Sequence, residues 1–290
     1  MRPDNLNTKI FLDSGDPDKT REIKELLGFL DGQTTNPTLI SRNPEAKQRL
    51  EQGDKFTEKE IYDFYQDVVR EISNLIPDGS VSIEVYADQD TSTDKMYHQS
   101  KKTFDWINNA HIKFPSTEKG LQAAEKATNN DMRVNMTLCF QQQQAAAVHA
   151  ATQGAEKGDV LVSPFIGRLD DEGENGMDLI ANTLRMYSMD DSHVEVLAAS
   201  IRNMQHFIAC LALEVDIITS PYEILKEWGE KGMPMPDDNF HYDRPDEKDL
   251  IPIPYKDLDL SQDWREFNLE HFKTDEGMES FSEDWNELIK

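Results

Sequence analysis

Short apolar runs alternate with longer stretches of helical periodicity along most of the chain. Residues 57–75 carry aromatic and aliphatic side chains three and four positions apart, which predicts an amphipathic helix. Further helices are expected at 141–153 and 177–187. The apolar runs predict eight strands, at residues 9–13, 29–33, 81–85, 111–114, 133–136, 160–163, 194–199 and 215–219.

This alternation predicts an α/β fold with a parallel sheet. Because each parallel connection needs a helical crossover, eight such units favour a closed (β/α)8 TIM barrel, which we expect over residues 1–228 as the catalytic domain. The alternative is an open, doubly wound sheet. No Gly-x-Gly-x-x-Gly motif follows any of the predicted strands, so the barrel is preferred.

The pattern changes after the eighth unit, and residues 229–290 form an acidic C-terminal extension. Residues 229–254 are rich in Pro, Asp and Met without a steady period, which indicates an ordered arm or a loose connection. A terminal amphipathic helix follows, with Thr274 as its expected N-cap. Its apolar stripe consists of Met278, Phe281, Trp285, Leu288 and Ile289. Such a stripe packs on its own barrel or on a neighbouring subunit, and we expect a homo-oligomer.

Charge narrows the range of partners. The 290 residues include 56 Asp and Glu and 30 Lys and Arg, for a formal net charge of −26. From residue 223 onward there are 20 acidic and 8 basic residues, a net −12. Nucleic acid is therefore not an expected partner. The first residues lack the apolar core of a signal peptide, and no run approaches the ~18 apolar residues of a membrane span. Two cysteines, Cys139 and Cys210, suggest buried free thiols, so we expect a soluble cytoplasmic protein with no membrane partner.

A lysine stands at the end of one apolar run. In His-Ile-Lys-Phe-Pro (111–115), Lys113 precedes the proline that stops the strand, so its side chain should point into whatever the strand encloses. An apolar enclosure disfavours an ammonium ion and makes the neutral, nucleophilic amine accessible near neutral pH. This is the chemistry of a Schiff-base lysine. Taken alone, the motif is more typical of a lysine that reaches the surface from a strand end.

Polar residues stand at the ends of most other predicted strands. In an eight-stranded barrel these ends meet at one mouth, where they can surround one substrate. The set comprises Asp13, Thr34, Thr35, Asn36, Glu84, Lys113, Asn135, Thr137, Ser163, Arg168, Ser200 and Arg202, with the apolar Phe165 beside Ser163. Alone, Asp13 could cap a helix, residues 36–37 could form a turn, and Arg168 could form a surface ion pair. Together they predict an active site.

Six blocks, in this order along the chain, resemble the transaldolase family. They are Phe-Leu-Asp (11–13), Asp-Gly-Gln-Thr-Thr-Asn-Pro-Thr-Leu-Ile (31–40), Ile-Lys-Phe-Pro-Ser-Thr (112–117), Val-Asn-Met-Thr-Leu (134–138), Ser-Pro-Phe-Ile-Gly-Arg (163–168) and Ala-Ser-Ile-Arg (199–202). The similarity runs from about residue 8 to 227, and residues 273–285 are similar to the terminal helix of short family members. The resemblance implies a class I aldol-transfer enzyme with a (β/α)8 barrel, no metal and no cofactor, acting on sugar phosphates of the pentose phosphate pathway.

The resemblance also implies roles for individual residues. Lys113 would form an imine with the C2 carbonyl of a ketose phosphate, and Asp13 would take the proton of the C4 hydroxyl. Glu84 and Thr137 would hold a catalytic water. The implied substrate-binding residues are Asn36, Asn135 and Ser163 at the hydroxyls of the three-carbon unit, Thr35 and Phe165 as further contacts, and Arg168, Ser200 and Arg202 at the phosphate.

Three functions are compatible with the resemblance. A transaldolase would move a dihydroxyacetone unit from fructose 6-phosphate or sedoheptulose 7-phosphate to erythrose 4-phosphate or glyceraldehyde 3-phosphate. A fructose 6-phosphate aldolase, a lyase of the same fold, would release free dihydroxyacetone. In the lyase members that this chain resembles, Gln and Tyr stand at the positions of Glu84 and Phe165. A non-catalytic sugar-phosphate binding barrel is the third possibility, and the intact catalytic set argues against it. The sequence therefore favours a transaldolase.

Three features depart from the family pattern. His111 stands where the family usually has an aliphatic residue, and two positions before Lys113 it should face inward, one barrel layer deeper. A core histidine with its hydrogen bonds satisfied is the preferred interpretation, over a histidine that tunes the lysine. Cys139 and glutamines 141–144 follow Thr137 without an evident role, and residues 229–270 have no recognisable counterpart.

Overall fold

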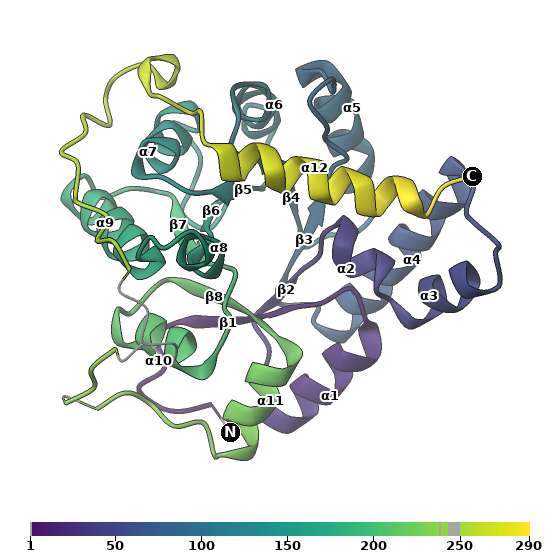
Figure 1. Ribbon diagram of the computed structural model, residues 1–290, viewed down its shortest axis with the longest axis horizontal. Coiled ribbons are helices and arrows are strands. Elements are labelled where there is room, and N and C mark those ends of the chain that lie inside the picture. The colour runs from purple at the N-terminus through teal and green to yellow at the C-terminus, as the bar shows by residue number, and fades with distance from the viewer. Residues whose placement is uncertain (1, 238, 243–249) are drawn as a thin grey trace.

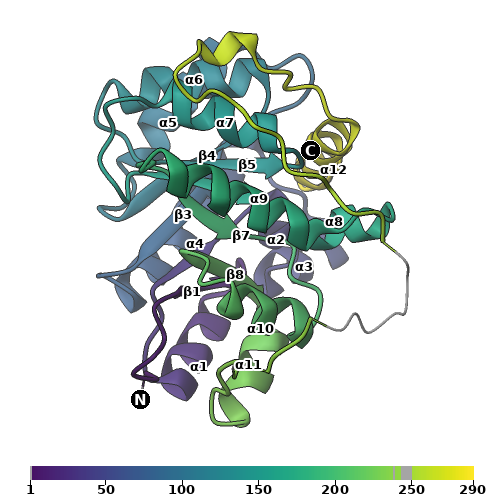
Figure 2. The same cartoon turned by 90° about the vertical axis from the view of Figure 1, so that its left-hand side faces the viewer.

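The computed structural model describes residues 2–237, 239–242 and 250–290. Eight parallel strands pair in chain order and close into a barrel, which confirms the predicted TIM-barrel fold. The closure is made by the first and last strands, where Phe11 lies opposite Thr219. Helices surround the barrel, as Figures 1 and 2 show.

The elements follow one another as eight βα units with additional helices. The strands are β1 Lys9–Asp13, β2 Gly32–Thr34, β3 Ser80–Glu84, β4 Ala110–Pro115, β5 Val134–Cys139, β6 Val160–Pro164, β7 Glu195–Ala198 and β8 Ile217–Pro221. The helices are α1 Pro17–Leu27, α2 Pro37–Ser41, α3 Pro44–Glu51, α4 Glu58–Leu75, α5 Thr93–Phe104, α6 Glu118–Thr128, α7 Gln142–Ala151, α8 Ile166–Asp171, α9 Gly176–Met189, α10 Met204–Ala212, α11 Tyr222–Glu230 and α12 Phe272–Glu287, with a short 3-10 helix, η1, at Trp264–Glu266.

Most predicted boundaries are close to the observed ones, and two strands are displaced. β2 begins at Gly32, three residues later than predicted, and β8 begins at Ile217, two residues later. In both cases apolar residues ahead of the strand, such as Leu30 and Val215, are buried without joining the barrel. The apolar character of these residues made both predicted strands begin too early. As a result β2 ends at Thr34 rather than at Gln33, which changes the side chain that faces the inside of the barrel.

Local signals explain where the long helices begin. Thr57 is the N-cap of α4 and forms a capping box with Glu60, in which each side chain bonds the other residue's backbone N–H. Asp16, Asn36 and Asn43 cap α1, α2 and α3, and each is followed directly by a proline in the first helical position.

Alternation along the strands separates two apolar regions. On β1, Ile10 and Leu12 belong to the large core between barrel and helices, whereas Phe11 belongs to a second cluster that also includes Leu161 of β6, Leu197 of β7 and Ile217 of β8. The Phe11 ring fills the space beside Gly32 of β2, where a Cβ would lie 2.5 Å from the ring. The packed interior gives the residues at the strand ends above it a rigid support.

The C-terminal extension runs back along the barrel as an ordered arm wherever the structure describes it; part of the predicted arm, residues 238 and 243–249, lies outside the described residues. Ile251 pairs with residues before α9, where its N–H bonds Gly173 O at 2.7 Å. The arm then passes α7, whose Gln142 bonds both the N–H and the carbonyl of Lys256. The division into a domain of 1–228 and an extension of 229–290 stays a prediction.

The terminal helix α12 packs across its own barrel and ends beside α3 and α4 (Figure 1). Met278, Phe281, Trp285 and Leu288 of the predicted stripe are buried there. The expected cap was wrong, because the helix begins at Phe272 with His271 as N-cap. Thr274 lies instead inside the fold, where its hydroxyl donates to Leu138 O at 3.0 Å.

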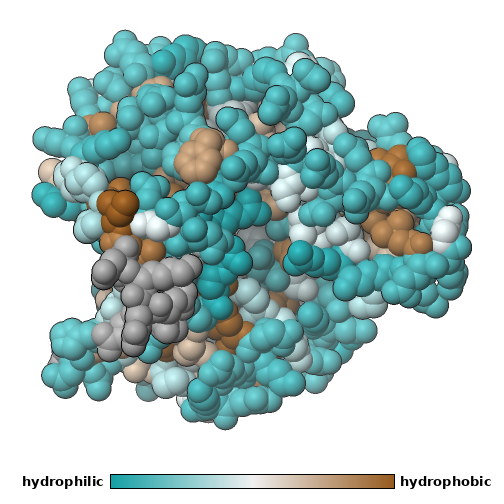
Figure 3. All heavy atoms as spheres, in the orientation of Figure 1, coloured by the Kyte–Doolittle hydropathy of each residue, from teal (hydrophilic) through white to brown (hydrophobic). Residues whose placement is uncertain are grey.

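The surface reflects the composition. The face in Figure 3 is mostly hydrophilic and is hollowed near its centre, beside α12. Among the described residues, no helix has the length and apolar character that crossing a membrane requires.

Candidate active site

A cavity of about 460 Å³ opens where the carboxyl ends of the strands meet. Most of the predicted site residues line it, namely Asp13, Asn36, Lys113, Thr137, Ser163, Phe165, Arg168, Ser200 and Arg202. Three predicted residues, Thr35, Glu84 and Asn135, contact these lining residues from behind. The structure thus brings together side chains from positions that are far apart in sequence.

Lys113 forms a buried ion pair with Glu84. The two residues are direct neighbours on β4 and β3, so their side chains share one face. Lys113 Nζ lies 2.9 Å from Glu84 Oε2, and each side chain is 5% exposed. Nζ also donates to the carbonyl of Thr35 at 3.1 Å. Burial raises the pKa of Glu84, and the charge of Lys113 opposes that shift.

Asp13, which is half-buried, is a second carboxyl group of the cavity. Thr34 Oγ1 donates to its Oδ1 at 2.6 Å and lies 2.5 Å from Thr219 Oγ1. Burial raises the pKa of Asp13, and Lys113 is the main opposing charge. The sequence analysis placed Thr34 at a strand end without assigning it a role, and it missed Thr219, which the same convergence rule would have included.

A hydrogen-bonded chain runs beneath the cavity from β6 to β3. Ser163 Oγ donates to Asn135 Oδ1 at 2.6 Å, and Asn135 Nδ2 donates to Ser82 Oγ at 3.1 Å. Thr137 differs from these residues, because its buried hydroxyl has no hydrogen-bond partner within the described part of the chain. A buried hydroxyl without a partner is costly unless a water or ligand satisfies it. The Thr137 hydroxyl is therefore a position on the cavity wall where a water or a ligand oxygen can bind.

The structure corrects the position of Thr35. Its hydroxyl bonds Ser82 O at 2.7 Å and lies 2.6 Å from the phenolic oxygen of Tyr65, away from the cavity. Successive residues on a strand point to opposite faces, so Thr34 faces the barrel and Thr35 does not. Asn36 lines the cavity and also caps α2, because its Oδ1 accepts from Leu39 N at 2.8 Å.

Two arginines and a strained serine form one wall. Arg168 is partly buried, and its guanidinium makes no hydrogen bond or ion pair with any residue that the structure describes. Arg202 lies nearby and pairs with Asp171 at 2.8 Å. Burial and the charge of Arg202 both lower the pKa of Arg168. Ser200 has φ +59°, a left-handed backbone conformation that is uncommon outside glycine. The wall offers unused cationic donors to an anion.

Helix α12 supplies part of the cavity that the sequence did not indicate. Ser280, Phe281 and Asp284 line the side next to α2, together with Arg42. The hydroxyl of Thr38 donates to Asp284, which ties α12 to α2. The apolar stripe predicted that the helix covers a surface, and the structure identifies this surface as the rim of the mouth.

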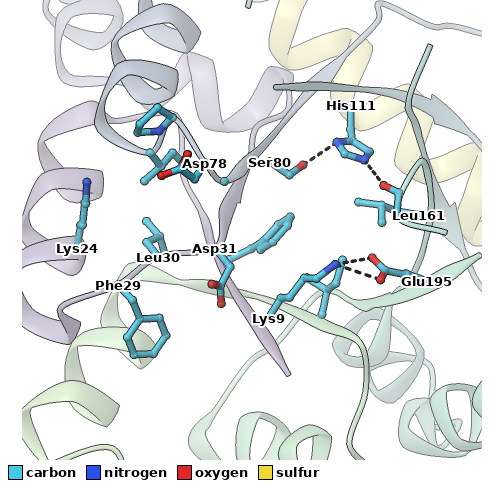
Figure 4. Close-up of a pocket in the computed structure, with 16 residues that line it drawn as sticks. Lys9, Lys24, Phe29, Leu30, Asp31, Asp78, Ser80, His111, Leu161 and Glu195 are labelled. Carbon is cyan, nitrogen blue, oxygen red and sulfur yellow. Dashed lines mark hydrogen bonds and ion pairs between the residues drawn. The ribbon is translucent and has the colours of Figure 1, made fainter. Parts of the chain in front are cut away.

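His111 lies at the opposite, amino-terminal end of the barrel (Figure 4). Its Nδ1 lies 2.7 Å from Ser80 Oγ and its Nε2 lies 2.9 Å from Gly158 O, so both ring nitrogens have partners. Burial lowers its pKa to about 4. A second cavity of about 400 Å³ at this end includes the ion pair of Lys9 with Glu195. His111 thus fits the preferred interpretation of a satisfied core histidine.

The described residues contain no group of three or more His, Cys, Asp or Glu side chains that could hold a metal ion. The polar groups at the mouth are instead an amine, carboxyl groups, hydroxyls, amides and guanidiniums. These can bind a polyol phosphate and move protons along it.

Known proteins match this chain over most of its length. The sequence profile of the family described as "Transaldolase/Fructose-6-phosphate aldolase" matches residues 10–290. A "Probable transaldolase" of Thermoplasma volcanium is 30% identical over 280 residues, covering 97% of this chain and 96% of that protein. A "Probable transaldolase" of Dehalococcoides mccartyi is 35% identical over 221 residues, covering 76% and 89%. Among solved structures, 3-hexulose-6-phosphate synthase from Salmonella typhimurium aligns with a TM-score of 0.48 at 10% identity, over 78% of this chain and 97% of that one. The profile and the two relatives place this chain in the transaldolase/fructose-6-phosphate aldolase family.

Proposed function

We propose that this chain is a transaldolase of the pentose phosphate pathway. It would transfer a dihydroxyacetone unit from fructose 6-phosphate or sedoheptulose 7-phosphate to erythrose 4-phosphate or glyceraldehyde 3-phosphate. The observation that carries the proposal is the buried amine of Lys113, which is 2.9 Å from the Glu84 carboxylate and opens on a cavity with unpaired polar groups. A lysine in this setting is suited to imine chemistry.

The first half of the reaction makes and uses the imine. The amine of Lys113 attacks C2 of the ketose, and the resulting carbinolamine loses water with a proton from Glu84. The protonated imine then withdraws electrons from the C3–C4 bond. Asp13 removes the proton of the C4 hydroxyl, C3–C4 breaks, and the aldose phosphate leaves. The raised pKa of each carboxyl group makes it a better partner for proton transfer near neutral pH.

The second half reverses these steps on the acceptor. The enamine left on Lys113 adds to the aldehyde carbon of the acceptor, Asp13 returns its proton to the new hydroxyl, and water releases the product ketose. Thr137, whose hydroxyl has no hydrogen-bond partner among the described residues, would hold that water together with Glu84. Ser163 and Asn135 would bind hydroxyls of the three-carbon unit. No step needs a metal ion, so EDTA should leave the rate unchanged.

The phosphate of donor or acceptor would bind at the arginine wall. Among the described residues none accepts a hydrogen bond from the Arg168 guanidinium, and guanidiniums bind phosphate through paired N–H groups. A local cationic wall lets a protein with a net charge of −26 hold an anionic substrate.

Trapping of the imine tests this proposal. Borohydride added with fructose 6-phosphate should reduce the imine, inactivate the enzyme and add the mass of the three-carbon unit to the peptide that contains Lys113. Lys113→Met should abolish both labelling and activity. Lys119→Met, which alters an exposed lysine after the same strand, should leave both intact. Labelling of another lysine, or activity in Lys113→Met, would contradict the assignment.

A further inference from the structure

Helix α12 is fixed on both sides of the cavity that it borders. Near its start, Lys273 pairs with Glu172, which directly follows α8, and Thr274 bonds Leu138 O at 3.0 Å. At its other end, the backbone of Phe56 accepts a hydrogen bond from Lys290 N at 2.9 Å. The helix, which crosses the barrel in Figure 1, is therefore held at defined points above the mouth. Its residues that face the cavity are restrained with it.

Two of these inward residues contact Arg168. The Cζ of Arg168 lies over the Phe281 ring, 5.1 Å from its centroid, and 5.3 Å from the centroid of Phe165. Gly277, one turn earlier on α12, leaves room for the guanidinium, since a Cβ there would lie 2.9 Å from Arg168 Nη1. The same Cβ would lie 2.6 Å from a methyl carbon of Leu138. Arg168 thus occupies a slot between the barrel and α12.

This arrangement restrains Arg168 through ring contacts that use none of its hydrogen-bond donors. Ring contacts act on the charge of the guanidinium, and no described residue occupies any of its five N–H groups. An ion pair with a carboxylate, like that of Arg202 with Asp171, would instead occupy some of them. A flexible arginine loses more conformational entropy on binding than one already held in place.

We propose that Phe281 and Gly277 of α12 are positioning residues that hold the Arg168 guanidinium in place for the substrate phosphate. The inference rests on the proposed function, because it takes Arg168 as the phosphate ligand. The C-terminal helix would then determine affinity for the phosphate group rather than the chemistry at Lys113. The simpler view is that Phe281 only anchors the helix, as its membership of the apolar cluster around Leu138 suggests.

The affinity for a sugar phosphate that cannot react distinguishes a positioning role of Phe281 from a role in anchoring the helix alone. Glucitol 6-phosphate lacks the carbonyl that imine formation needs, so its dissociation constant, measured by calorimetric titration, reports binding alone. Phe281→Leu removes the ring and should weaken binding about five- to tenfold. Phe281→Tyr keeps the aromatic ring, so its dissociation constant should be within about twofold of the wild-type value. Met278→Ala, a buried control on the same helix and in the same cluster, should lower thermal stability without changing this affinity.

Gly277→Ala provides a second variant, and because its methyl group also meets Leu138, its thermal stability is measured beside its affinity. Its methyl group should displace the guanidinium and weaken binding to a similar extent. Arg168→Ala sets the scale and should weaken binding about ten- to a hundredfold.

The outcomes distinguish two failures. If Arg168→Ala weakens binding but Phe281→Leu and Gly277→Ala behave like Met278→Ala, the positioning role is overturned and the proposed function stands. If Arg168→Ala leaves the affinity unchanged, the phosphate site itself is misplaced, and the inference falls with it.

Discussion

Lys113 Nζ and Glu84 Oε2 lie 2.9 Å apart on neighbouring strands, with both side chains almost fully buried. A buried ion pair contributes little to stability when the cost of removing two charges from water is included. Its value in an active site is chemical, because the carboxyl group can give a proton to the oxygen that leaves during imine formation and take one back during hydrolysis.

Glu84→Gln should therefore lower kcat about a hundredfold, since the amide can still hold water but cannot transfer a proton. Phe165 offers no phenolic group that could compensate. Stopped-flow mixing followed by borohydride trapping should show slower imine formation, with the label still on Lys113. A kcat within about threefold of wild type would show that Glu84 is not the proton donor.

Gln144 at the start of α7 should be important for stability. Its Oε1 accepts from Phe140 N at 2.8 Å, and the two N–H groups of its Nε2 lie within hydrogen-bond distance of three acceptors, Ser116 O, Leu269 O and Thr274 Oγ1. Gln144→Ala leaves several buried groups unpaired and should lower the free energy of unfolding by about 3 kcal/mol. Urea denaturation measures this change in the free energy of unfolding. The neighbouring Gln143→Ala, which loses one exposed bond to Asn268 N, is the control and should cost under about 0.5 kcal/mol. Equal effects would contradict this role.

His111 should make the protein sensitive to acid. Its pKa falls from the usual 6.5 to about 4 in the fold, so between these pH values the unfolded chain binds more protons than the folded one. Stability should therefore decrease as the pH falls from 6.5 to 4, by up to about 3 kcal/mol. His111→Asn removes the titrating group, and its unfolding free energy should decline less over this interval. Parallel pH curves for the two proteins would exclude the effect.

Phe165→Tyr tests what distinguishes transfer from release. Releasing dihydroxyacetone requires a proton on the enamine carbon followed by hydrolysis, and a phenol in the cavity can donate that proton. Phe165 lines the cavity, so the variant should raise dihydroxyacetone release relative to transfer. Phe281→Tyr adds a hydroxyl on the α12 side of the same cavity and should leave the ratio unchanged. If Phe165→Tyr leaves the ratio of dihydroxyacetone release to transfer unchanged, the absence of a phenol at position 165 does not explain transferase behaviour.

The sequence predicted the barrel and most of its mouth because both depend on local periodicity. Strand ends converge in this fold, so Asp13, Lys113 and Thr137 could be grouped without knowing any contact. Thr35 was misplaced because the predicted second strand ended one residue early, at Gln33. With a side-chain period of two, an uncertainty of one residue exchanges the inward and outward faces, and the inward residue is Thr34.

Contacts of the C-terminal extension could not be predicted in this way. The apolar stripe of α12 indicates that the helix covers something, but the surface it covers depends on how residues 250–271 travel around the barrel. That path depends on side chains such as Gln142 and Gln144, which bond backbone groups more than 100 positions away. Neither periodicity nor composition contains such pairings.

The most direct test of the central claim is the amount of dihydroxyacetone formed per fructose 6-phosphate consumed, with and without erythrose 4-phosphate. For a transaldolase, the enamine on Lys113 waits for an aldehyde. Addition of erythrose 4-phosphate should then produce sedoheptulose 7-phosphate in step with donor consumption, and dihydroxyacetone should be a minor product in both cases. If the wild-type enzyme releases dihydroxyacetone as fast as it transfers the three-carbon unit, the protein is a fructose 6-phosphate aldolase and the transaldolase account is wrong.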